Sequence, residues 1–276
     1  MNVRDLKILV RGAGDVSTGI IWTLAYAGFK VVCIDIEKPS CIRTEVSYST
    51  AIYDGEKTLG DITCVYVKNE NEIDNVLNQG KVALLIDPNA EILKNRKFDV
   101  VIDAILAKKN LGTTIDMAKL VIGVGPGFTV NKDCNRAIET MRGHTLAKIY
   151  TEGSPLKDTG IPGLIASHAA DRVMHSPCEG IFHNVHKIGD KVSKGEVLSH
   201  IDEYVDGKPT GNRVNLYASI DGLLRGILKD GFYAKNNLKC ADIDPRLTEY
   251  ENCFTISDKA RSIGGAVLTA IMNYFK

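Results

Sequence analysis

Short apolar runs alternate with helical stretches through the first 150 residues. The runs predict buried strands at residues 6–10, 29–36, 62–67, 82–86, 100–105 and 120–122. Residues 15–28 predict a helix that ends at Gly28, and a second helix is expected at about residues 70–79. Because alternating strands and helices favour a parallel sheet with right-handed crossovers, we expect residues 1–150 to form a Rossmann-like nucleotide- or cofactor-binding domain.

The pattern changes after residue 150. Residues 151–172 are rich in glycine and proline and predict a linker. Residues 173–250 contain short apolar runs separated by glycine turns, which predicts a small all-β module. Two segments, at 176–202 and 216–245, share one spacing of apolar residues and glycine turns.

These two segments resemble the barrel-sandwich module of biotinyl and lipoyl carrier domains, in which two such halves wrap together. Carrier domains present a modified lysine in a tight hairpin between the halves. Here the longer segment EYVDGKPTGNRVN takes that place, and its Lys208 lacks the neighbours of a modified lysine. We therefore expect no attachment of biotin or lipoate.

The last segment, residues 251–276, predicts a helix. Ser257 is a suitable N-cap, and apolar residues at three- and four-residue spacing follow it on one face. Gly264 and Gly265 would be costly in an exposed helix, so they indicate close approach of another backbone. The sequence leaves open which domain this helix packs against. The predicted fold class is therefore an α/β chain with a Rossmann-like parallel sheet, a barrel-sandwich β module and a C-terminal helix.

A glycine turn follows the first predicted strand. Gly12 and Gly14 suit a tight turn that brings a phosphate to the start of a helix, where Asp15 and Ser17 follow. Asp35 ends the second strand 21 residues after Gly14, where a ribose-binding acid is expected. These residues predict a cofactor-binding site, although the glycines alone could serve helix–strand packing.

Further candidates lie at other strand ends. Asp35, Asp87 and Asp103 each end an apolar run, so a parallel sheet would place them on the edge where ligands bind. Each of them could instead cap the helix or turn that follows it. Lys109 follows Asp103 and adds a cation near that edge. Asp103 and Lys109 are accordingly candidate catalytic residues. A second glycine loop after the strand at 120–122 predicts another anion-binding turn, with candidates Gly123, Gly125 and Gly127.

Four candidate residues come after the second glycine loop: Cys134, Glu139, Arg142 and His144. Cys134, Glu139 and His144 could supply a nucleophile, an orienting acid and a base, or they could be metal ligands. The alternative is a packed cysteine beside a Glu139–Arg142 ion pair. The pair of histidines at 183 and 186 is a weak metal signal on a β-hairpin, and no metal site is predicted.

Composition limits the classes of partner and the compartment that we expect for the chain. Lys+Arg and Asp+Glu are 34 each, so no global charge attracts nucleic acid or an anionic membrane, and an anionic ligand needs a local site. No apolar run is long enough to span a membrane. Seven cysteines without a C-x-x-C pair are typical of a reducing compartment, so a cytoplasmic location is expected. The oligomeric state stays open, with a homo-oligomer among the expectations.

Several segments, together with the carrier-like module, resemble accessory proteins of the selenium-dependent molybdenum hydroxylase system. The segments are RGAGDVSTGI, VVIDAILAKKNLGTT, VIGVGPGF, DCNRAIETMRGH and ISDKARSIGGAVL. The accessory proteins of that system are distantly similar to xanthine dehydrogenase accessory proteins. The resemblance implies a maturation role, a molybdenum hydroxylase as partner, and a molybdopterin-type cofactor or dinucleotide as the small anionic ligand. Cys134 is then a candidate carrier of sulfur or selenium, which requires a lowered pKa. The alternatives are an NAD(P)-dependent oxidoreductase and a non-catalytic scaffold, and whether the chain is an enzyme stays open.

Overall fold

The computed structural model describes residues 3–160, 163, 166 and 168–276. The chain divides into two units, each made of separate stretches of sequence. Unit 1 contains Met1–Pro39, Ser47–Thr159 and Ile256–Lys276. Unit 2 contains Ser40–Val46 and Gly160–Thr255.

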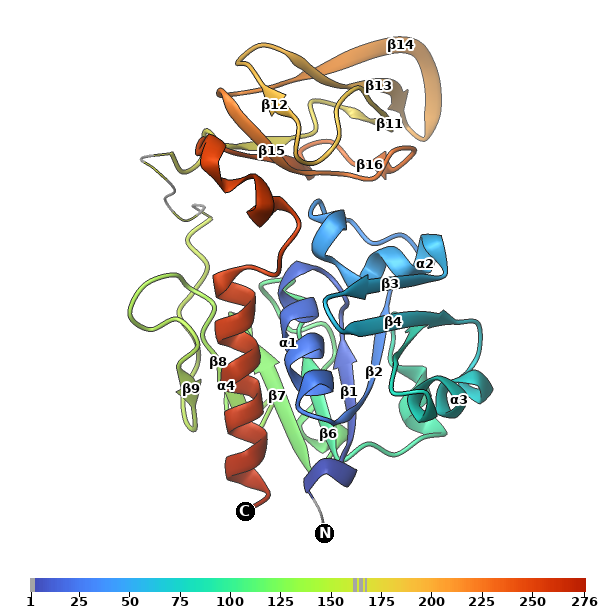
Figure 1. Ribbon diagram of the computed structural model, residues 1–276, viewed down its shortest axis with the longest axis vertical. Helices are drawn as coiled ribbons and strands as arrows, with labels where there is room; N and C mark the ends of the chain where they lie inside the picture. The colour runs from blue at the N-terminus through green and yellow to red at the C-terminus, as the bar shows by residue number, and fades with distance from the viewer. Residues whose placement is uncertain (1–2, 161–162, 164–165, 167) are drawn as a thin grey trace. The chain divides into compact units, whose positions relative to one another are not determined.

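Unit 1 is built on a nine-stranded sheet with the order β3-β4-β5-β2-β1-β6-β7-β8-β9 (Figure 1). The inner strands from β4 to β8 run parallel, whereas β3 and β9 pair antiparallel at the two edges. In chain order the strands are β1 (Lys7–Arg11), β2 (Lys30–Asp35), β3 (Glu56–Leu59), β4 (Ile62–Val67), β5 (Val82–Ile86), β6 (Val100–Asp103), β7 (Leu120–Val124), β8 (Arg136–Ile138) and β9 (Ile149–Tyr150).

Two long helices, α1 (Asp15–Tyr26) and α4 (Asp258–Tyr274), lie side by side on one face of this sheet (Figure 1). They approach closely because both carry a glycine at the contact. A Cβ on Gly19 would lie 2.5 Å from the Ala260 carbonyl oxygen, and one on Gly264 would lie 2.4 Å from Thr23 Oγ1. The short helices are α2 (Ala51–Asp54) and α3 (Ile73–Asn78), and the 3₁₀ turns of unit 1 lie at Val3–Asp5, Tyr48–Thr50, Glu70–Glu72, Glu91–Lys94 and Ile115–Met117.

Unit 2 contains two four-stranded antiparallel sheets, ordered β10-β17-β15-β12 and β14-β13-β11-β16. Their inner faces share one apolar core that includes Phe182, Ile201 and Leu224. The strands are β10 (Val173–His175), β11 (Glu179–Asn184), β12 (Lys191–Val192), β13 (Val197–Val205), β14 (Lys208–Tyr217), β15 (Gly222–Ile227), β16 (Tyr233–Ala234) and β17 (Lys239–Asp244), with 3₁₀ turns at Thr44–Val46 and Leu247–Cys253.

The segment Ser40–Val46 joins unit 2 although it is distant in sequence. The backbone N–H of Ile227 donates to the carbonyl oxygen of Ile42 over 2.8 Å, and the Ile42 side chain is part of the unit 2 core. The Arg43 guanidinium is buried and donates to the carbonyl oxygens of Asn252 and Thr255, 2.9 and 3.3 Å away.

The predicted fold class, a Rossmann-like parallel sheet followed by a biotinyl/lipoyl-like barrel-sandwich module, is wrong. The large sheet is mixed and has nine strands, and the β region forms two antiparallel sheets. Part of the error is a missed hairpin, since β3 and β4 are joined by Gly60 and Asp61, with Gly60 at φ +57°. A Gly-Asp pair between two strands is a hairpin signal, but β3 reads EKTL with only Leu59 buried, so the apolar pattern did not mark a strand before it.

Several local predictions are confirmed. Strands β4 and β5 have the predicted bounds, and the Ser257 side chain accepts a hydrogen bond from the Ala260 N–H as N-cap of α4. The helix α4 belongs to unit 1. The close backbone approach holds for Gly264 and not for Gly265, near which a Cβ would meet nothing within 4 Å. Within the described residues, no helix is both long and apolar enough to cross a membrane.

Candidate functional site

The glycine turn after β1 is held by its neighbours on the sheet. Gly12 has φ +98°, and its N–H donates to the Ile34 carbonyl oxygen over 2.8 Å. A Cβ at this position would lie 2.9 Å from the carbonyl oxygen of Ala104, which follows β6. Gly12 is therefore needed for a conformation that other residues rarely adopt and for close approach of the backbone after β6.

Residues 47–49, together with Thr18 of α1, cover the middle of the turn. The Ala13 carbonyl oxygen accepts hydrogen bonds from Ser47 Oγ at 2.9 Å, Ser49 N at 2.8 Å and Thr18 Oγ1 at 3.2 Å. Gly12 and Ala13 are consequently buried, and only residues 14–16 are half-exposed. The accessible part of the turn is therefore the first turn of α1.

Helix α1 begins without a capping side chain. Its N-cap is Gly14, in extended backbone conformation, and no side chain makes a cap hydrogen bond there. The Ser17 hydroxyl instead donates backward to the Gly14 carbonyl oxygen over 3.0 Å. The first N–H groups of a helix lack intrahelical acceptors, so a half-exposed start of this kind can accept an anion.

The predicted ribose-binding acid, Asp35, supports the glycine turn. Its Oδ2 accepts the Ala13 N–H over 2.8 Å, and its Oδ1 accepts the Ile36 N–H over 2.7 Å. Burial raises the pKa of Asp35, and the two backbone donors oppose that rise. The structure thus brings Asp35 together with Gly12 and Gly14, as predicted, with both carboxylate oxygens already bonded.

Asp103 lies in a buried network with Arg11. Both side chains are nearly inaccessible, and Arg11 Nη1 lies 3.2 Å from Asp103 Oδ2. The same oxygen accepts the Thr113 hydroxyl over 2.6 Å, while Oδ1 accepts the Ile105 N–H over 3.1 Å. Asp103 therefore joins the ends of β1 and β6 and the loop between Ala104 and Thr113, rather than facing solvent.

Asp87 serves as a cap. Its two carboxylate oxygens accept the N–H groups of Glu91 and Ile92, each over 2.9 Å, at the start of a 3₁₀ turn. This is the alternative role that the sequence offered for each acid at a strand end.

The second glycine loop is filled by packing. A Cβ on Gly123 would lie 2.3 Å from the Phe128 ring, and one on Gly127 would lie 2.6 Å from the Cα of Lys109. The Gly125 N–H is already used, because it donates to the Ile138 carbonyl oxygen over 2.8 Å. These glycines therefore admit neighbouring groups of the protein, and the exposed Lys109 meets the loop through its backbone.

The Cys134 thiol is fully buried. Its Sγ lies 3.9 Å from the Thr129 carbonyl oxygen, and burial raises the pKa of Cys134 to about 11. A reactive cysteine needs a lowered pKa and access to solvent, so these surroundings are opposite to those that its proposed role requires.

Glu139, Arg142 and His144, which follow Cys134, do not gather into one site. Glu139 is fully buried and accepts the N–H groups of Thr140, Met141 and Leu156 and the Tyr150 hydroxyl. Arg142 pairs instead with Asp258 of α4, at 2.9 and 3.2 Å, and His144 is exposed. Glu139 thus fixes the 139–156 loop and is not the partner of Arg142.

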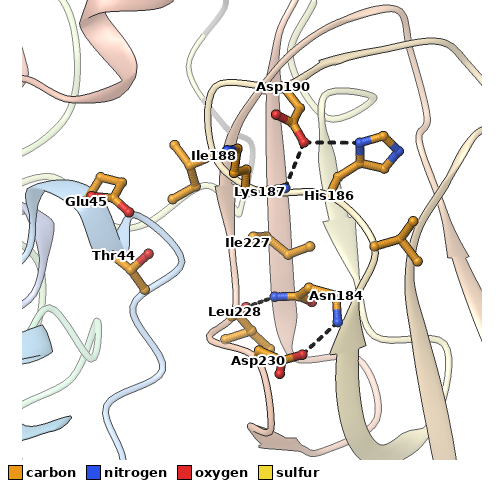
Figure 2. Close-up of a pocket in the computed structure, with 11 residues that line it drawn as sticks. Thr44, Glu45, Asn184, His186, Lys187, Ile188, Asp190, Ile227, Leu228 and Asp230 are labelled. Atoms are coloured by element: carbon orange, nitrogen blue, oxygen red, sulfur yellow. Dashed lines mark hydrogen bonds and ion pairs between the residues drawn. The ribbon is translucent and has the colours of Figure 1, made fainter. Parts of the chain in front are cut away.

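A pocket of about 420 Å³ lies within unit 2 and was not anticipated from the sequence (Figure 2). It is lined by Thr44 and Glu45, by residues 184–188 with Asp190, and by residues 227, 228 and 230. Asn184 is central to it, because its N–H donates to Asp230 and its Nδ2 to the Leu228 carbonyl oxygen, both over 2.8 Å. Three stretches distant in sequence form this pocket, so no local motif could have predicted it.

The histidines at 183 and 186 have separate partners. His183 Nε2 lies 2.8 Å from Asp202, whereas His186 lies 3.3 Å from Asp190 and 3.0 Å from Glu196 through its two ring nitrogens. In the described part of the chain, no three His, Cys, Asp or Glu side chains gather so as to hold a metal ion.

Comparison with known proteins gives one curated relative at high similarity. No family model matches the chain. The chain is 40% identical over 265 residues to "Uncharacterized protein YqeB" of Escherichia coli strain K12. The match covers 96% of this chain and 47% of the relative, so the chain spans about half the length of the curated relative.

Solved structures give weaker likenesses. The ectoine utilization protein EutE (DoeB) from Ruegeria pomeroyi is 14% identical, with 87% of this chain and 52% of that chain covered and a TM-score of 0.24. A succinylglutamate desuccinylase/aspartoacylase from Rhodobacter sphaeroides is 10% identical, with 88% and 86% covered and a TM-score of 0.29. Scores this low establish neither a common fold nor a shared activity.

These findings correct the functional expectation from the sequence. The curated relative has no assigned activity, and the structures are named for ectoine utilization, desuccinylase and aspartoacylase. None points to an accessory protein of a selenium-dependent molybdenum hydroxylase, so that resemblance and the maturation role drawn from it are overturned. The two alternatives, an NAD(P)-dependent oxidoreductase and a scaffold for the hydroxylase, receive no support either.

Proposed function

We propose that unit 1 binds a small anionic ligand at the start of α1. One observation carries the proposal: the first turn of this helix is uncapped and half-exposed, and it follows the carboxyl end of β1. The parallel strands continue from β1 to β2 on one side and to β6 on the other. In open α/β sheets, ligands bind outside the carboxyl ends of strands at such a change of direction.

The chemistry of the helix start favours an anion. Backbone N–H groups of the first turn point away from the helix body, and the helix dipole places partial positive charge there. A phosphate or carboxylate group of the ligand would accept from these groups. Because the formal net charge of the chain is zero, this local arrangement supplies the attraction.

Two exposed isoleucines flank the turn and indicate the rest of the ligand. Ile36 is 46% exposed and follows Asp35, whose carboxylate accepts the Ala13 N–H. Ile105 is 37% exposed, and its Cα would lie 3.2 Å from a Cβ on Gly12. Apolar side chains beside an anion-binding turn favour a ligand that joins an anionic group to an apolar ring.

Titration calorimetry with inorganic pyrophosphate and with ADP tests the proposal, because ADP adds a ring to the same anion. Val16→Glu adds a second negative charge to the first turn, next to that of Asp15, where it is compatible with the helix dipole but further repels an anion. We expect at least about tenfold weaker binding, equivalent to about 1.4 kcal/mol.

Thr269→Glu on α4 adds the same charge away from the start of α1 and should leave affinity within about twofold. The proposal is wrong if neither probe binds at millimolar concentration, or if Val16→Glu binds as tightly as the unmodified chain. Tighter binding of ADP than of pyrophosphate would support the ring-bearing ligand.

We also propose the cytoplasm as the compartment of this chain. The structure describes all seven cysteines and joins none of them in a disulfide, which is typical of proteins in a reducing environment. Labelling of cysteines in freshly lysed cells under denaturing conditions would test this, because disulfide-linked cysteines would escape the label.

A further inference from the structure

One segment of the chain, residues 40–50, has one end in each unit. Ser40–Val46 belongs to unit 2, whereas Ser47 begins the next stretch of unit 1. Val46 and Ser47 are consecutive, so a single peptide bond joins the two parts of the segment. Because the peptide bond is stiff and its length is fixed, a displacement of the first part moves the second.

The unit 2 end of the segment is anchored by backbone and side-chain bonds. The Ile42 carbonyl oxygen accepts the Ile227 N–H over 2.8 Å, and the Ile42 side chain is buried in the unit 2 core. The buried Arg43 guanidinium donates to the carbonyl oxygens of Asn252 and Thr255, at 2.9 and 3.3 Å. Thr255 is the last residue of unit 2, so Arg43 also bonds the place where the chain leaves this unit for α4.

The unit 1 end of the segment holds the carbonyl group of Ala13. Ser47 Oγ and the Ser49 N–H donate to this oxygen over 2.9 and 2.8 Å. The Tyr48 N–H donates to Thr18 Oγ1 over 2.9 Å, and that hydroxyl donates to the same Ala13 oxygen over 3.2 Å. All these residues are buried, so the position of residues 47–49 determines the orientation of the carbonyl group.

The orientation of the Ala13 carbonyl group also determines that of the Gly14 N–H. The peptide bond between the two residues is planar and trans, so its N–H points opposite to its carbonyl oxygen. Gly14 is the half-exposed N-cap of α1. Residues 47–49 therefore direct a backbone donor away from themselves, at the helix start where we place the anion.

We propose that unit 2 positions the anion-binding turn of unit 1 through the 40–50 segment, with Arg43 as a positioning residue. This inference rests on the proposed function and adds the dependence of that site on unit 2. Without the hydrogen bonds of Arg43, residues 40–46 lose their anchor and residues 47–49 hold the Ala13 carbonyl group less firmly. The turn is then less well organised for the anion before binding, which lowers affinity.

The test measures pyrophosphate binding to the whole chain by titration calorimetry. Arg43→Met should bind pyrophosphate about fivefold more weakly than the unmodified chain. Hydrogen exchange of the Ser49 amide, measured without ligand, should be about tenfold faster in this variant, because that N–H donates to Ala13. Arg43→Lys keeps one cationic donor and should give intermediate values, and it replaces Arg43→Met in the test if that variant does not fold.

A double-mutant cycle shows whether Arg43 acts through the segment. Ser47→Ala removes one donor to the Ala13 oxygen at the unit 1 end and should also weaken pyrophosphate binding. If both residues act on the same carbonyl group, the loss of affinity in the double variant is clearly smaller than the product of the two single losses. A loss equal to that product overturns the proposal, because Arg43 and Ser47 would then act independently.

Arg172→Met is the matched control, because it removes another buried guanidinium from unit 2. Among the described residues, that guanidinium bonds Asp242 and Gly163. Its loss should leave pyrophosphate affinity within about twofold and Ser49 exchange unchanged. The proposal is overturned if Arg43→Met binds pyrophosphate like the unmodified chain, if its Ser49 exchange is unchanged, or if Arg172→Met shows the same losses. Absence of binding to the unmodified chain would instead overturn the anion site itself, so the two failures are distinguishable.

Discussion

The glycine loops after β1 and β7 are alike in sequence and different in their surroundings. Both approach the segment after β6: a Cβ on Gly12 would meet Ala104, and one on Gly127 would meet Lys109. The loop after β1 leads directly into the 12-residue helix α1. Residues 125–135, all of which the structure describes, contain turns and no helix before β8 begins at Arg136.

This difference separates two roles of glycine. In both loops a glycine admits a neighbouring backbone, which is a packing role. Only the first loop also presents the start of a long helix to solvent, and an anion site of this kind uses the first N–H groups of a helix. In these two loops the glycines mark the close approach of another backbone, while ligand binding depends on whether a helix begins directly after the glycines.

The largest expected effect comes from breaking the support that both loops share. Arg11 and Asp103 tie β1 to β6 at the base of the segment that both loops contact. Asp103→Ala leaves Arg11 buried without its carboxylate, and we expect a loss of about 3–5 kcal/mol in the free energy of unfolding, measured with urea.

Asp116→Ala, at an exposed position, is the control and should change stability by less than about 0.5 kcal/mol. Replacing the pair together, by Arg11→Met with Asp103→Leu, should recover most of the loss because no unpaired charge remains. If Asp103→Ala matched the control, the buried pair would not hold this edge.

A smaller effect is expected from filling the second loop. Gly127→Ala combines a backbone conformation unfavourable for alanine, φ +104°, with a Cβ 2.6 Å from Lys109 Cα. We expect a destabilisation of about 2–4 kcal/mol by urea denaturation. Gly112→Ala isolates the conformational part, because Gly112 has φ +87° and open space around its Cβ, and should cost about 1–2 kcal/mol.

The same variant sharpens the comparison between the loops. Pyrophosphate affinity of folded Gly127→Ala should equal that of the unmodified chain, since the proposed anion site lies at the first loop and the second is filled by packing. A marked loss of affinity in that variant alone would move the anion site to the second loop.

The smallest effect concerns Asp35 and pH. Burial raises the folded-state pKa of Asp35, so the protonated carboxyl contributes stability below the unfolded-state pKa of about 3.9. That contribution is lost as pH rises through the folded-state pKa. Asp35→Asn has no such carboxyl and lacks this contribution. The free energy of unfolding of the unmodified chain, relative to that of this variant, should therefore fall as the pH rises from the unfolded-state pKa through the folded-state pKa. Urea denaturation of both proteins at a series of pH values measures the difference, and parallel pH profiles would contradict it.

The sequence predicted most elements of unit 1 and missed the sheet edges. Strands β4 and β5 and the N-cap Ser257 follow from local pattern, because periodicity and capping depend on residues a few positions apart. The hairpin at Gly60 and Asp61 has a local signal of the same kind, although it was not predicted. The segment Ser40–Val46, by contrast, carries no local sign of its pairing with β15 in unit 2.

The positions of several candidate site residues were predictable from the sequence, whereas the contacts of their side chains were not. The sequence placed Gly12, Gly14 and Asp35 together at the end of β1 and β2, and the structure agrees. It could not show that both carboxylate oxygens of Asp35 are bonded to the backbone, or that the Cys134 thiol is buried. These properties depend on which groups arrive from elsewhere in the chain.

By itself, the sequence determined where strands, helices and tight turns form, since those follow from the periodicity of apolar residues and the freedom of glycine. Only the tertiary structure decided what each strand-end residue does. Arg11 and Asp103 meet across 92 positions, and the unit 2 pocket joins residues near 44, 187 and 228. Burial, pairing and solvent access of a side chain depend on such distant neighbours, and these determine whether an acid, a glycine or a thiol is available to a ligand.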